Sequence, residues 1–289
     1  MTRQSLRAAL RTATEYLADS GVPSPAADAE LLAAHVLNTT RTRLGLTPFL
    51  SEEQSVQFSA FVARRAKREP LQYITGIASM GEIDVAVGPG VFIPRPETEL
   101  LLGWVLSYMQ AHGLHTPRVV DLCSGSGALA FAIAHARPDA EVHAVERNPA
   151  ALKWLEHNHV RRVRAGDPAV AIHAADVTEP QLLQDLSGTV DVIVANPPYV
   201  PLAAPVTAEV AEFEPADAVF SGVDGLGVIR PMVSVIARLL RQSGAAAIEH
   251  DDSNGAEVCG LLAASGSFTD VTQHADLAEK PRYVTAVRA

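Results

Sequence analysis

The stretch Val119-Val-Asp-Leu-Cys-Ser-Gly-Ser-Gly-Ala-Leu-Ala130 runs from apolar residues into a glycine-rich turn and on into a helix-favouring segment. We predict a strand at Arg118–Leu122 and a helix that opens at Ala128. Glycine lets the backbone approach a ligand closely, and the first turn of a helix leaves N–H groups free to donate. The turn therefore predicts a ligand site on a Rossmann-like sheet. The spacing of Gly125 and Gly127 also matches the dinucleotide pattern, so the turn alone leaves the ligand open.

Strand-like and helix-like segments alternate along the chain after Pro117. We expect strands at Arg118–Leu122, Glu141–Val145, Ala169–Ala174, Val190–Ala195 and Ala245–Ile248. We expect helices at Ala128–Ala136, Pro149–Arg161, Gln181–Leu186, Val228–Arg241 and Gly255–Ala264. Such alternation predicts an α/β fold with a mostly parallel sheet that is covered on both faces. The consecutive strand-like runs Phe268–His274 and Tyr283–Arg288 predict a terminal antiparallel hairpin.

The first part of the chain has a different pattern. Apolar residues recur at helical spacing from Leu6 to Leu17, and Ser24-Pro25 resembles the start of a second helix over Ala26–Leu37. Ser51-Glu-Glu-Gln54 resembles a capping box that leads into a helix over Val56–Arg68. Residues 1–75 are therefore expected to form a small helical bundle.

A short β-rich segment is expected to follow the bundle. The alternating run Glu82–Val87, the turn Gly88-Pro-Gly90 and the run Val91-Phe-Ile93 predict a β-hairpin, after which Glu97–Met109 returns to helix. We thus expect a helical domain at 1–75, a β-hairpin linker at 76–96 and a Rossmann-like catalytic domain at 97–289.

Charge and composition exclude several classes of protein. The 289-residue chain has a net charge of −10, with 23 Lys/Arg and 33 Asp/Glu residues. Residues 1–90 hold nine of each sign, which leaves 14 basic and 24 acidic residues for the remainder. Phosphate binding needs clustered positive charge, so direct nucleic-acid binding is disfavoured.

No apolar run approaches the roughly 18 residues of a membrane span, and the first residues lack a secretory signal, so we expect a cytoplasmic protein without membrane contact. The two cysteines, Cys123 and Cys259, form no ligand pair and the ten histidines are scattered, so no metal site is expected.

Three acidic residues lie where successive predicted strands end. Asp121 precedes the glycines, Glu146 follows the second strand and Asp176 follows the third. A carboxylate ahead of the turn suits the ammonium and sulfonium groups of S-adenosylmethionine better than the anionic pyrophosphate of a dinucleotide. Glu146 can accept from ribose hydroxyls, and Asp176 can accept from an adenine amino group. Parallel strands end at one edge of a sheet, so these acids predict one S-adenosylmethionine site.

The segment Asn196-Pro-Pro-Tyr199 follows the predicted strand Val190–Ala195 at the same edge. An amide nitrogen is a poor nucleophile, and its hydrogens must be held for methyl transfer. The side-chain oxygen of Asn196 and the carbonyl of Pro197 are suitable acceptors, and consecutive prolines hold them rigidly. Tyr199 offers a flat face for a planar group. The segment therefore predicts methylation of a planar amide or amine nitrogen, with Asn196, Pro197 and Tyr199 as the catalytic residues and Pro198 also in the substrate site.

At these residues the sequence resembles the HemK/PrmC family of class I protein-glutamine methyltransferases. The likeness covers nearly the whole chain. It includes Arg65-x-x-x-Glu-Pro-Leu-Gln-Tyr-Ile-x-Gly76, Val91-Phe-Ile-Pro-Arg-Pro-Glu-Thr-Glu99, the turn Asp121–Ala130 and the segment Asn196–Tyr199. Ser79-Met-Gly81 and Glu249–Gly255 depart from the family pattern, which leaves the details of docking open.

The resemblance implies transfer of a methyl group from S-adenosyl-L-methionine to the side-chain nitrogen of the glutamine in the Gly-Gly-Gln motif of peptide chain release factors, with S-adenosyl-L-homocysteine as the product. It implies that the N-terminal domain helps to dock the release factor. It places the substrate glutamine against Asn196–Tyr199. Together with the turn and the acids, it assigns the cofactor to Asp121, Cys123, Ser124, Gly125, Ser126, Gly127, Glu146, Asp176, Val177 and Asn196.

Three other functions remain as alternatives. An adenine-N6 nucleic-acid methyltransferase shares the Asn196–Tyr199 segment, but the acidic charge of the chain argues against it. A nicotinamide-dependent oxidoreductase accounts for the glycine turn and leaves Asn196–Tyr199 unexplained. A non-catalytic module that binds release factors would be expected to carry a degenerate turn or an altered Asn196–Tyr199, and both are intact.

Overall fold

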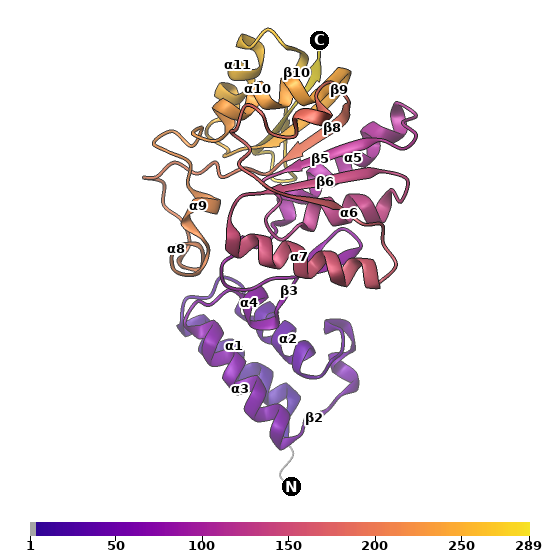
Figure 1. The fold of residues 1–289 in the computed structure, drawn as a ribbon. Helices are drawn as coiled ribbons and strands as arrows, with labels where there is room; N and C mark the ends of the chain where they lie inside the picture. Colours follow the sequence, from indigo (N-terminus) through magenta and orange to yellow (C-terminus); the bar gives the residue numbers. More distant parts are fainter. Residues whose placement is uncertain (1–3) are drawn as a thin grey trace. The chain divides into compact units, whose positions relative to one another are not determined.

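A computed structural model describes residues 4–289 and contains a seven-stranded sheet in the order β10-β11-β9-β8-β5-β6-β7 (Figure 1). Its central pairs, β9–β8, β8–β5, β5–β6 and β6–β7, are parallel, whereas β11 pairs antiparallel with β9 and with β10. The mostly parallel sheet with a terminal antiparallel hairpin is thereby confirmed. The strands are β5 (Arg118–Leu122), β6 (Glu141–Glu146), β7 (Ala171–Ala174), β8 (Val190–Ala195), β9 (Leu240–Glu249), β10 (Phe268–Ala275) and β11 (Pro281–Arg288).

Helices cover both faces of this sheet. One group consists of α5 (Glu99–Ala111), α6 (Ala128–Ala136) and α7 (Pro149–Arg164), and the other of α10 (Ile229–Leu239) and α11 (Gly255–Ala264) (Figure 1). The buried runs 119–122 of β5, 192–195 of β8 and 245–248 of β9 are mostly apolar because both faces of the sheet are covered here. The main core joins Val120 and Ile193 of the sheet to Ile236 of α10 and Leu262 of α11. This core holds the ends of the parallel strands in fixed positions.

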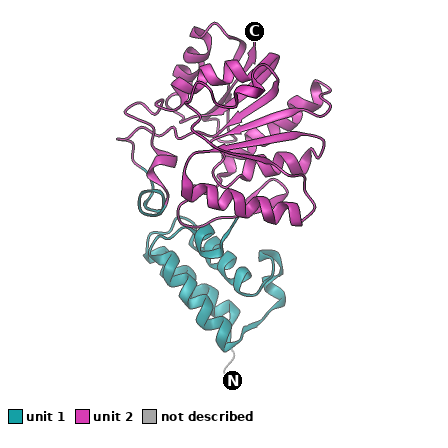
Figure 2. Cartoon of the chain, in the orientation of Figure 1, with its two compact units in different colours: residues 1–77, 206–213 teal, residues 78–205, 214–289 magenta. Residues whose placement is uncertain are grey.

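The chain divides into two compact units (Figure 2). Unit 1 comprises residues 1–77 and 206–213, and unit 2 comprises residues 78–205 and 214–289. Unit 1 contains the helices α1 (Leu6–Asp19), α2 (Pro25–Val36), α3 (Glu52–Ala66), α4 (Leu71–Thr75) and α8 (Ala208–Phe213), the 3-10 turn Arg41–Leu46, and the short paired strands β1 (Gln4–Ser5) and β2 (Phe49–Leu50).

The predicted capping box of α3 is confirmed. Ser51 Oγ accepts from the backbone N–H of Gln54 at 3.1 Å, and Gln54 Oε1 accepts from the backbone N–H of Ser51 at 2.9 Å. The two bonds satisfy N–H groups that the first turn of a helix otherwise leaves without partners. The predicted proline also opens α2, where Pro25 occupies the first turn.

The β-hairpin lies earlier in the chain than its sequence pattern predicts. The paired strands are β3 (Ile77–Met80) and β4 (Ile83–Ala86), so the turn is at Gly81, whose φ is +56°. Residues 88–93 form no strand. Instead this segment packs on α7: a β-carbon added at Gly88 would lie 2.6 Å from the Trp154 ring, and Trp154 Nε1 donates to the carbonyl of Pro89 at 3.2 Å.

The predicted helix Gln181–Leu186 is also wrong in extent. Only a 3-10 turn at Gln184–Leu186 forms, because Leu183 adopts a left-handed conformation with φ of +47° and interrupts the segment. Two short helical segments that the sequence analysis did not predict follow β8, namely α8 in unit 1 and α9 (Ala216–Val219) in unit 2.

A buried ion-pair network joins residues 206–213 to the helices of unit 1. Arg65 of α3 donates to Asp28 of α2 at 2.7 Å and to Glu209 of α8 at 2.9 Å, and Arg68 donates to both oxygens of Glu209. Burial works to raise the pKa of Glu209, but the hydrogen bonds from Arg68 and Arg65 outweigh it and lower the pKa to about 2. Glu209 therefore stays ionised, and the network holds α8 against α3.

Replacement of Arg65 tests how far unit 1 depends on this network. Arg65→Ala leaves the carboxylates of Asp28 and Glu209 without their shared partner, and breaking a buried pair costs about 3–5 kcal/mol. Arg64→Ala on the same helix removes only a half-exposed pair with Glu69, worth about 1 kcal/mol or less. Hydrogen exchange of the α2 and α3 amides should rise far more in Arg65→Ala than in Arg64→Ala. Equal exchange in the two variants would contradict a stabilising role for the network.

Candidate active site

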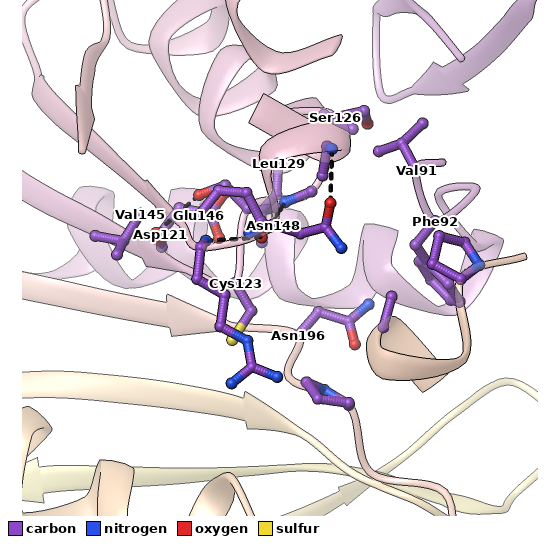
Figure 3. A pocket seen from close by; sticks show the side chains of 18 of the residues that line it. Val91, Phe92, Asp121, Cys123, Ser126, Leu129, Val145, Glu146, Asn148 and Asn196 are labelled. Carbon is purple, nitrogen blue, oxygen red and sulfur yellow. Dashed lines mark hydrogen bonds between the residues drawn. The ribbon is translucent and has the colours of Figure 1, made fainter. Parts of the chain in front are cut away.

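A pocket of about 950 Å³, including its mouth, opens at the carboxyl ends of β5, β6 and β8 in unit 2 (Figure 3). The turns that follow these strands supply much of its lining, because parallel strands all end at one edge of the sheet. Of the residues proposed from the sequence, the pocket is lined by Asp121, Cys123, Ser124, Gly125, Ser126, Glu146, Asp176, Val177, Asn196 and Pro198. Gly127, Pro197 and Tyr199 are not among its lining residues.

The carboxylate of Glu146 holds the glycine turn in place. Its Oε2 accepts from the backbone N–H of Gly125 at 2.8 Å. Its Oε1 accepts from the backbone N–H groups of Arg147 and Asn148 at 2.8 and 2.7 Å. A carboxylate oxygen has a second lone pair, so Glu146 can still accept from a ligand in the pocket. The side chain therefore links the loop after β6 to the loop after β5.

The two glycines of the turn have different roles. A β-carbon at Gly125 would have only Val91 within reach, at 4.0 Å, so the position is open toward the pocket. A β-carbon at Gly127 would lie 2.3 Å from Phe131 of α6 and 2.4 Å from Leu155 of α7. Gly127 has a left-handed conformation at the start of α6, with φ of +81°. It serves the packing of α6 on α7, whereas Gly125 leaves space for a ligand.

Asp121 places a buried carboxylate with an unused oxygen at the pocket. The side chain is 2% exposed, and Oδ2 has no hydrogen-bond partner among the described residues. Burial raises the pKa of Asp121 to about 7 and Glu146 adds to the rise, whereas hydrogen bonds from Ser124 and from the backbone of Ala130 oppose it. A buried acceptor without a partner is costly, so a ligand that brings an N–H donor or a positive charge fits this position.

Asp176 is held by its own loop and by Arg147. Its Oδ1 accepts from the N–H and the hydroxyl of Thr178, and its Oδ2 accepts from Arg147 at 2.9 Å. Although burial works to raise the pKa of Asp176, the hydrogen bonds from Thr178 and Arg147 lower it. The carboxylate is therefore ionised and fixed at the rim of the pocket.

Asn196 has a defined orientation, because its Nδ2 donates to the hydroxyl of Thr98 at 3.0 Å. This bond leaves Oδ1 of Asn196 as the free end of the side chain in the pocket (Figure 3). Thr98 is buried and also lines the pocket. The sequence analysis did not assign Thr98 to the site, although it lies in the segment Val91–Glu99 that carried the family resemblance.

Other lining residues were also missed by sequence reasoning. Asn148 caps α7 by accepting from Ala150 and Ala151, and its Nδ2 donates to Asp217 at 2.9 Å. The remaining pocket residues that the sequence analysis did not assign to the site include Met80, Val91, Phe92, Pro94, Asp217 and Ala218. Asn148 carried one usable signal, since an Asn-Pro pair at a helix start is a typical N-cap.

Tyr199 does not present a free hydroxyl. Its hydroxyl donates to Oε1 of Glu249 at 2.9 Å, and its ring packs against the main core. Burial raises the pKa of Tyr199 well above its ordinary value, and the neighbouring Glu249 adds to the rise. Pro197 is also buried. Tyr199 and Pro197 are thus packed residues beside Asn196 and Pro198 in the chain, and neither lines the pocket.

Within residues 4–289, no group of three or more His, Cys, Asp or Glu side chains is arranged to hold a metal ion. Over the same residues, no helix is both long and apolar enough to span a membrane.

The strand order, the glycine turn and the acids at successive strand ends define a class I methyltransferase. Two family models match the chain, the PrmC N-terminal domain over residues 8–76 and the methyltransferase small domain over residues 83–213. The chain is 48% identical to the release factor glutamine methyltransferase of Mycolicibacterium smegmatis, with 100% of this chain and 99% of the relative covered. It is 45% identical to that of Corynebacterium glutamicum, with 98% of each covered. The chain therefore belongs to the release factor glutamine methyltransferase family.

A solved structure supports the fold. The T. thermophilus 16S rRNA N2 G1207 methyltransferase (RsmC), determined in complex with AdoMet and guanosine, aligns with a TM-score of 0.51 at 23% identity. The alignment covers 74% of this chain and 50% of that chain. The likeness shows a shared methyltransferase fold.

The raised pKa of Asp121 predicts how stability changes with pH in the cofactor-free protein. Because the folded-state pKa of about 7 lies above the ordinary value, the stability gained from the neutral form is complete below about pH 4 and is lost as the pH rises through 7. Asp121→Asn avoids this loss. The melting temperature of Asp121→Asn minus that of the wild type should therefore be larger at pH 8 than at pH 5, by at least about 2–4 °C.

Asp139→Asn provides the control for this measurement. A hydrogen bond from Arg137 lowers the pKa of the exposed Asp139, so its contribution does not change between pH 5 and pH 8. A difference between Asp121→Asn and wild type that stays constant over this range would show that Asp121 does not titrate there.

Proposed function

We propose that this protein transfers a methyl group from S-adenosyl-L-methionine to the side-chain amide nitrogen of the glutamine in the Gly-Gly-Gln motif of peptide chain release factors. The full-length identity of 48% and 45% to two release factor glutamine methyltransferases supports this substrate class. The observation that carries the mechanism is the fixed orientation of Asn196, whose side-chain oxygen is left free at the pocket.

The pocket residues fit S-adenosylmethionine. The unpartnered Oδ2 of Asp121 suits the ammonium of the methionyl group, and the free lone pairs of Glu146 suit the ribose hydroxyls. The ionised Asp176 suits the adenine amino group, and Cys123–Ser126 form the backbone cradle between these acids. When bound, the cofactor supplies an electrophilic methyl group and leaves as S-adenosyl-L-homocysteine.

The residues around Asn196 are suited to orient an amide nitrogen. Because Nδ2 of Asn196 donates to Thr98, the end of the amide that is left for the substrate is the acceptor Oδ1, and an acceptor is what the hydrogens of a glutamine amide require. The carbonyl of Pro197 is a second acceptor whose direction two prolines restrain. The glutamine nitrogen is neutral before transfer and can lose its proton afterwards. Catalysis then rests on holding the nitrogen in line with the methyl group.

We further propose that the N-terminal helical domain, expected over residues 1–75, helps to dock the release factor, and that residues 97–289 carry the transfer. The match of the PrmC N-terminal domain model to residues 8–76 supports a family-specific role for the helices. A cytoplasmic location accords with a substrate that acts in translation.

Methyl transfer from labelled S-adenosylmethionine to purified release factor tests the function. Wild-type release factor should accept label, whereas a release factor with the tip glutamine changed to glutamate lacks the nucleophilic nitrogen and should accept none. Duplex DNA is offered as a third candidate acceptor in the same assay. Label on adenine together with an unlabelled release factor would replace the proposal with an adenine-N6 methyltransferase.

Glu146→Ala should weaken binding of S-adenosylmethionine by at least about tenfold. The substitution removes the carboxylate that accepts from the N–H of Gly125, together with the lone pairs proposed for the two ribose hydroxyls. Charge-assisted hydrogen bonds contribute roughly 1.5–3 kcal/mol each. Glu141→Ala, at the opposite end of the same strand β6, is the matched control and should bind normally. Calorimetry that finds less than a twofold change for Glu146→Ala would remove this residue from the cofactor site.

Asn196→Ala should lower turnover by roughly a hundredfold while cofactor affinity stays within a few-fold, as expected when an orienting contact is lost. Tyr199→Ala should be more severe than Tyr199→Phe, because the ring of Tyr199 packs against the main core close in the chain to Asn196. Turnover is measured on release factor at saturating cofactor, and affinity is measured by calorimetry. Full turnover by Asn196→Ala would contradict the positioning mechanism.

A further inference from the structure

We propose that Glu249 is a positioning residue of the methyl transfer, which fixes the orientation of Asn196 through the hydroxyl of Thr98. The inference rests on the proposed function, because it concerns the residue that orients the substrate amide. Glu249 does not line the pocket and is not expected to contact the substrate or the cofactor.

Glu249 ends β9 in the interior of unit 2. Its side chain is completely buried, and its neighbour Ile248 pairs with Ala195, the residue directly before Asn196. Oε1 of Glu249 accepts from the hydroxyl of Tyr199 at 2.9 Å. The two strand ends therefore bring a buried carboxylate directly behind the Asn196–Tyr199 segment.

Thr98 connects this carboxylate to the pocket. Its oxygen accepts from Nδ2 of Asn196 at 3.0 Å, which leaves the hydroxyl hydrogen to find another acceptor. The Glu249 carboxylate interacts with that hydroxyl, and the interaction lowers the pKa of Glu249. Oε2 of Glu249 is buried and has no partner in hydrogen-bond geometry among the described residues, so it is an acceptor still available to the Thr98 hydroxyl.

The donors in this arrangement all point one way. Asn196 donates to Thr98, Tyr199 donates to Oε1 of Glu249, and Oε2 of Glu249 is the acceptor that we assign to the Thr98 hydroxyl. An ionised carboxylate can only accept, so it determines the direction of the Thr98 hydroxyl. The lone pairs of Thr98 then face Asn196, which keeps its Nδ2 turned inward and its Oδ1 turned toward the substrate.

The protonation state of Glu249 should therefore affect the rate. Burial raises the pKa of Glu249 to about 7, and Glu97 adds to the rise, whereas hydrogen bonds from Tyr199 and Thr98 and the charge of Arg282 oppose it. The adjacent His250 is buried, which lowers its pKa and favours its neutral form. A protonated Glu249 becomes a donor and competes with Asn196 for the oxygen of Thr98. Methyl transfer should then slow as the pH falls through about 7.

This effect can be separated from the titration of Asp121. Asp121 lines the cofactor pocket, so its protonation should weaken binding of S-adenosylmethionine. Glu249 acts on Asn196, so its protonation should lower the single-turnover rate even when the cofactor is saturating. Affinity and rate therefore report on different carboxylates.

The test compares wild type, Glu249→Gln and Glu257→Gln in single-turnover methylation of release factor at saturating S-adenosylmethionine from pH 5.5 to pH 8.5. Glu257 is an exposed carboxylate of α11 and serves as the matched control. Glu249→Gln should be about tenfold slower at pH 8, with cofactor affinity within twofold. Its rate should no longer fall between pH 8 and pH 6. Glu257→Gln should follow the wild-type profile.

Two variants of Thr98 test the same connection independently, in case Glu249→Gln fails to fold. Thr98→Val removes the hydroxyl at nearly constant shape and should reproduce the loss of rate, whereas Thr98→Ser keeps the hydroxyl and should restore most of it. The effects of Glu249→Gln and Thr98→Val should not add in the double variant, because both break the same connection. Additive effects, or a folded Glu249→Gln with the wild-type rate and pH profile, would overturn the proposal.

A spectroscopic measurement needs no substrate and separates this inference from the proposed function. The side-chain amide resonances of Asn196 should titrate near pH 7 in the wild type and in Glu257→Gln, and this titration should be lost in Glu249→Gln. A wild-type protein that shows the titration but does not methylate release factor would refute the proposed function alone. Resonances that titrate identically in Glu249→Gln would refute the role of Glu249.

Discussion

The carboxylate of Glu146 is the contact on which the geometry of the pocket depends. It accepts from the backbone of Gly125 in one loop and from Arg147 and Asn148 in the next. Because three backbone N–H groups donate to this one carboxylate, the loops after β5 and β6 are held in a single conformation. Either loop would lose a charge-assisted hydrogen bond if it moved. The sheet brings the strand ends together at one edge, and Glu146 fixes the loops that follow two of these strands. Gly125 in the first loop leaves space for a ligand.

Three of the buried acids of unit 2, namely Glu146, Asp121 and Glu249, show how the same functional group is used in different ways. Glu146 accepts from three backbone N–H groups and keeps lone pairs for a ligand, Asp121 has an oxygen without a partner at the pocket, and Glu249, which does not line the pocket, accepts from the hydroxyl of Tyr199. Desolvation disfavours the charged form of such groups, and only donors or a bound cation compensate for it. Asp121 is consequently suited to a ligand, whereas Glu249 is suited to hold other side chains.

The path of the chain links the Asn196–Tyr199 segment to the helical unit. After β8 the chain passes through residues 206–213, which pack within unit 1, and then returns to the pocket residues Pro215, Asp217 and Ala218. Glu209 is held there by Arg65 and Arg68, and just beyond the segment Glu214 pairs with Arg95 of unit 2. Within unit 2, the ion pair of Glu214 with Arg95 holds the chain directly before the pocket residues Pro215, Asp217 and Ala218.

Much of the sheet, and ten of the residues proposed for the site that do line the pocket, follow from the sequence, because local patterns carry that information. An apolar strand that runs into Gly125-Ser-Gly127 has few possible conformations, and strand alternation places Asp121, Glu146 and Asn196 at one edge. The roles that depend on distant contacts were decided only by the tertiary structure. Gly127 serves helix packing because Phe131 and Leu155 occupy the space beside it. Thr98 enters the site because α5 begins beside β8, and Tyr199 turns its hydroxyl to Glu249 because β9 ends next to it. Hydrogen bonds between residues 50 or more positions apart leave no periodic trace in a sequence, since each partner needs only the right place in space.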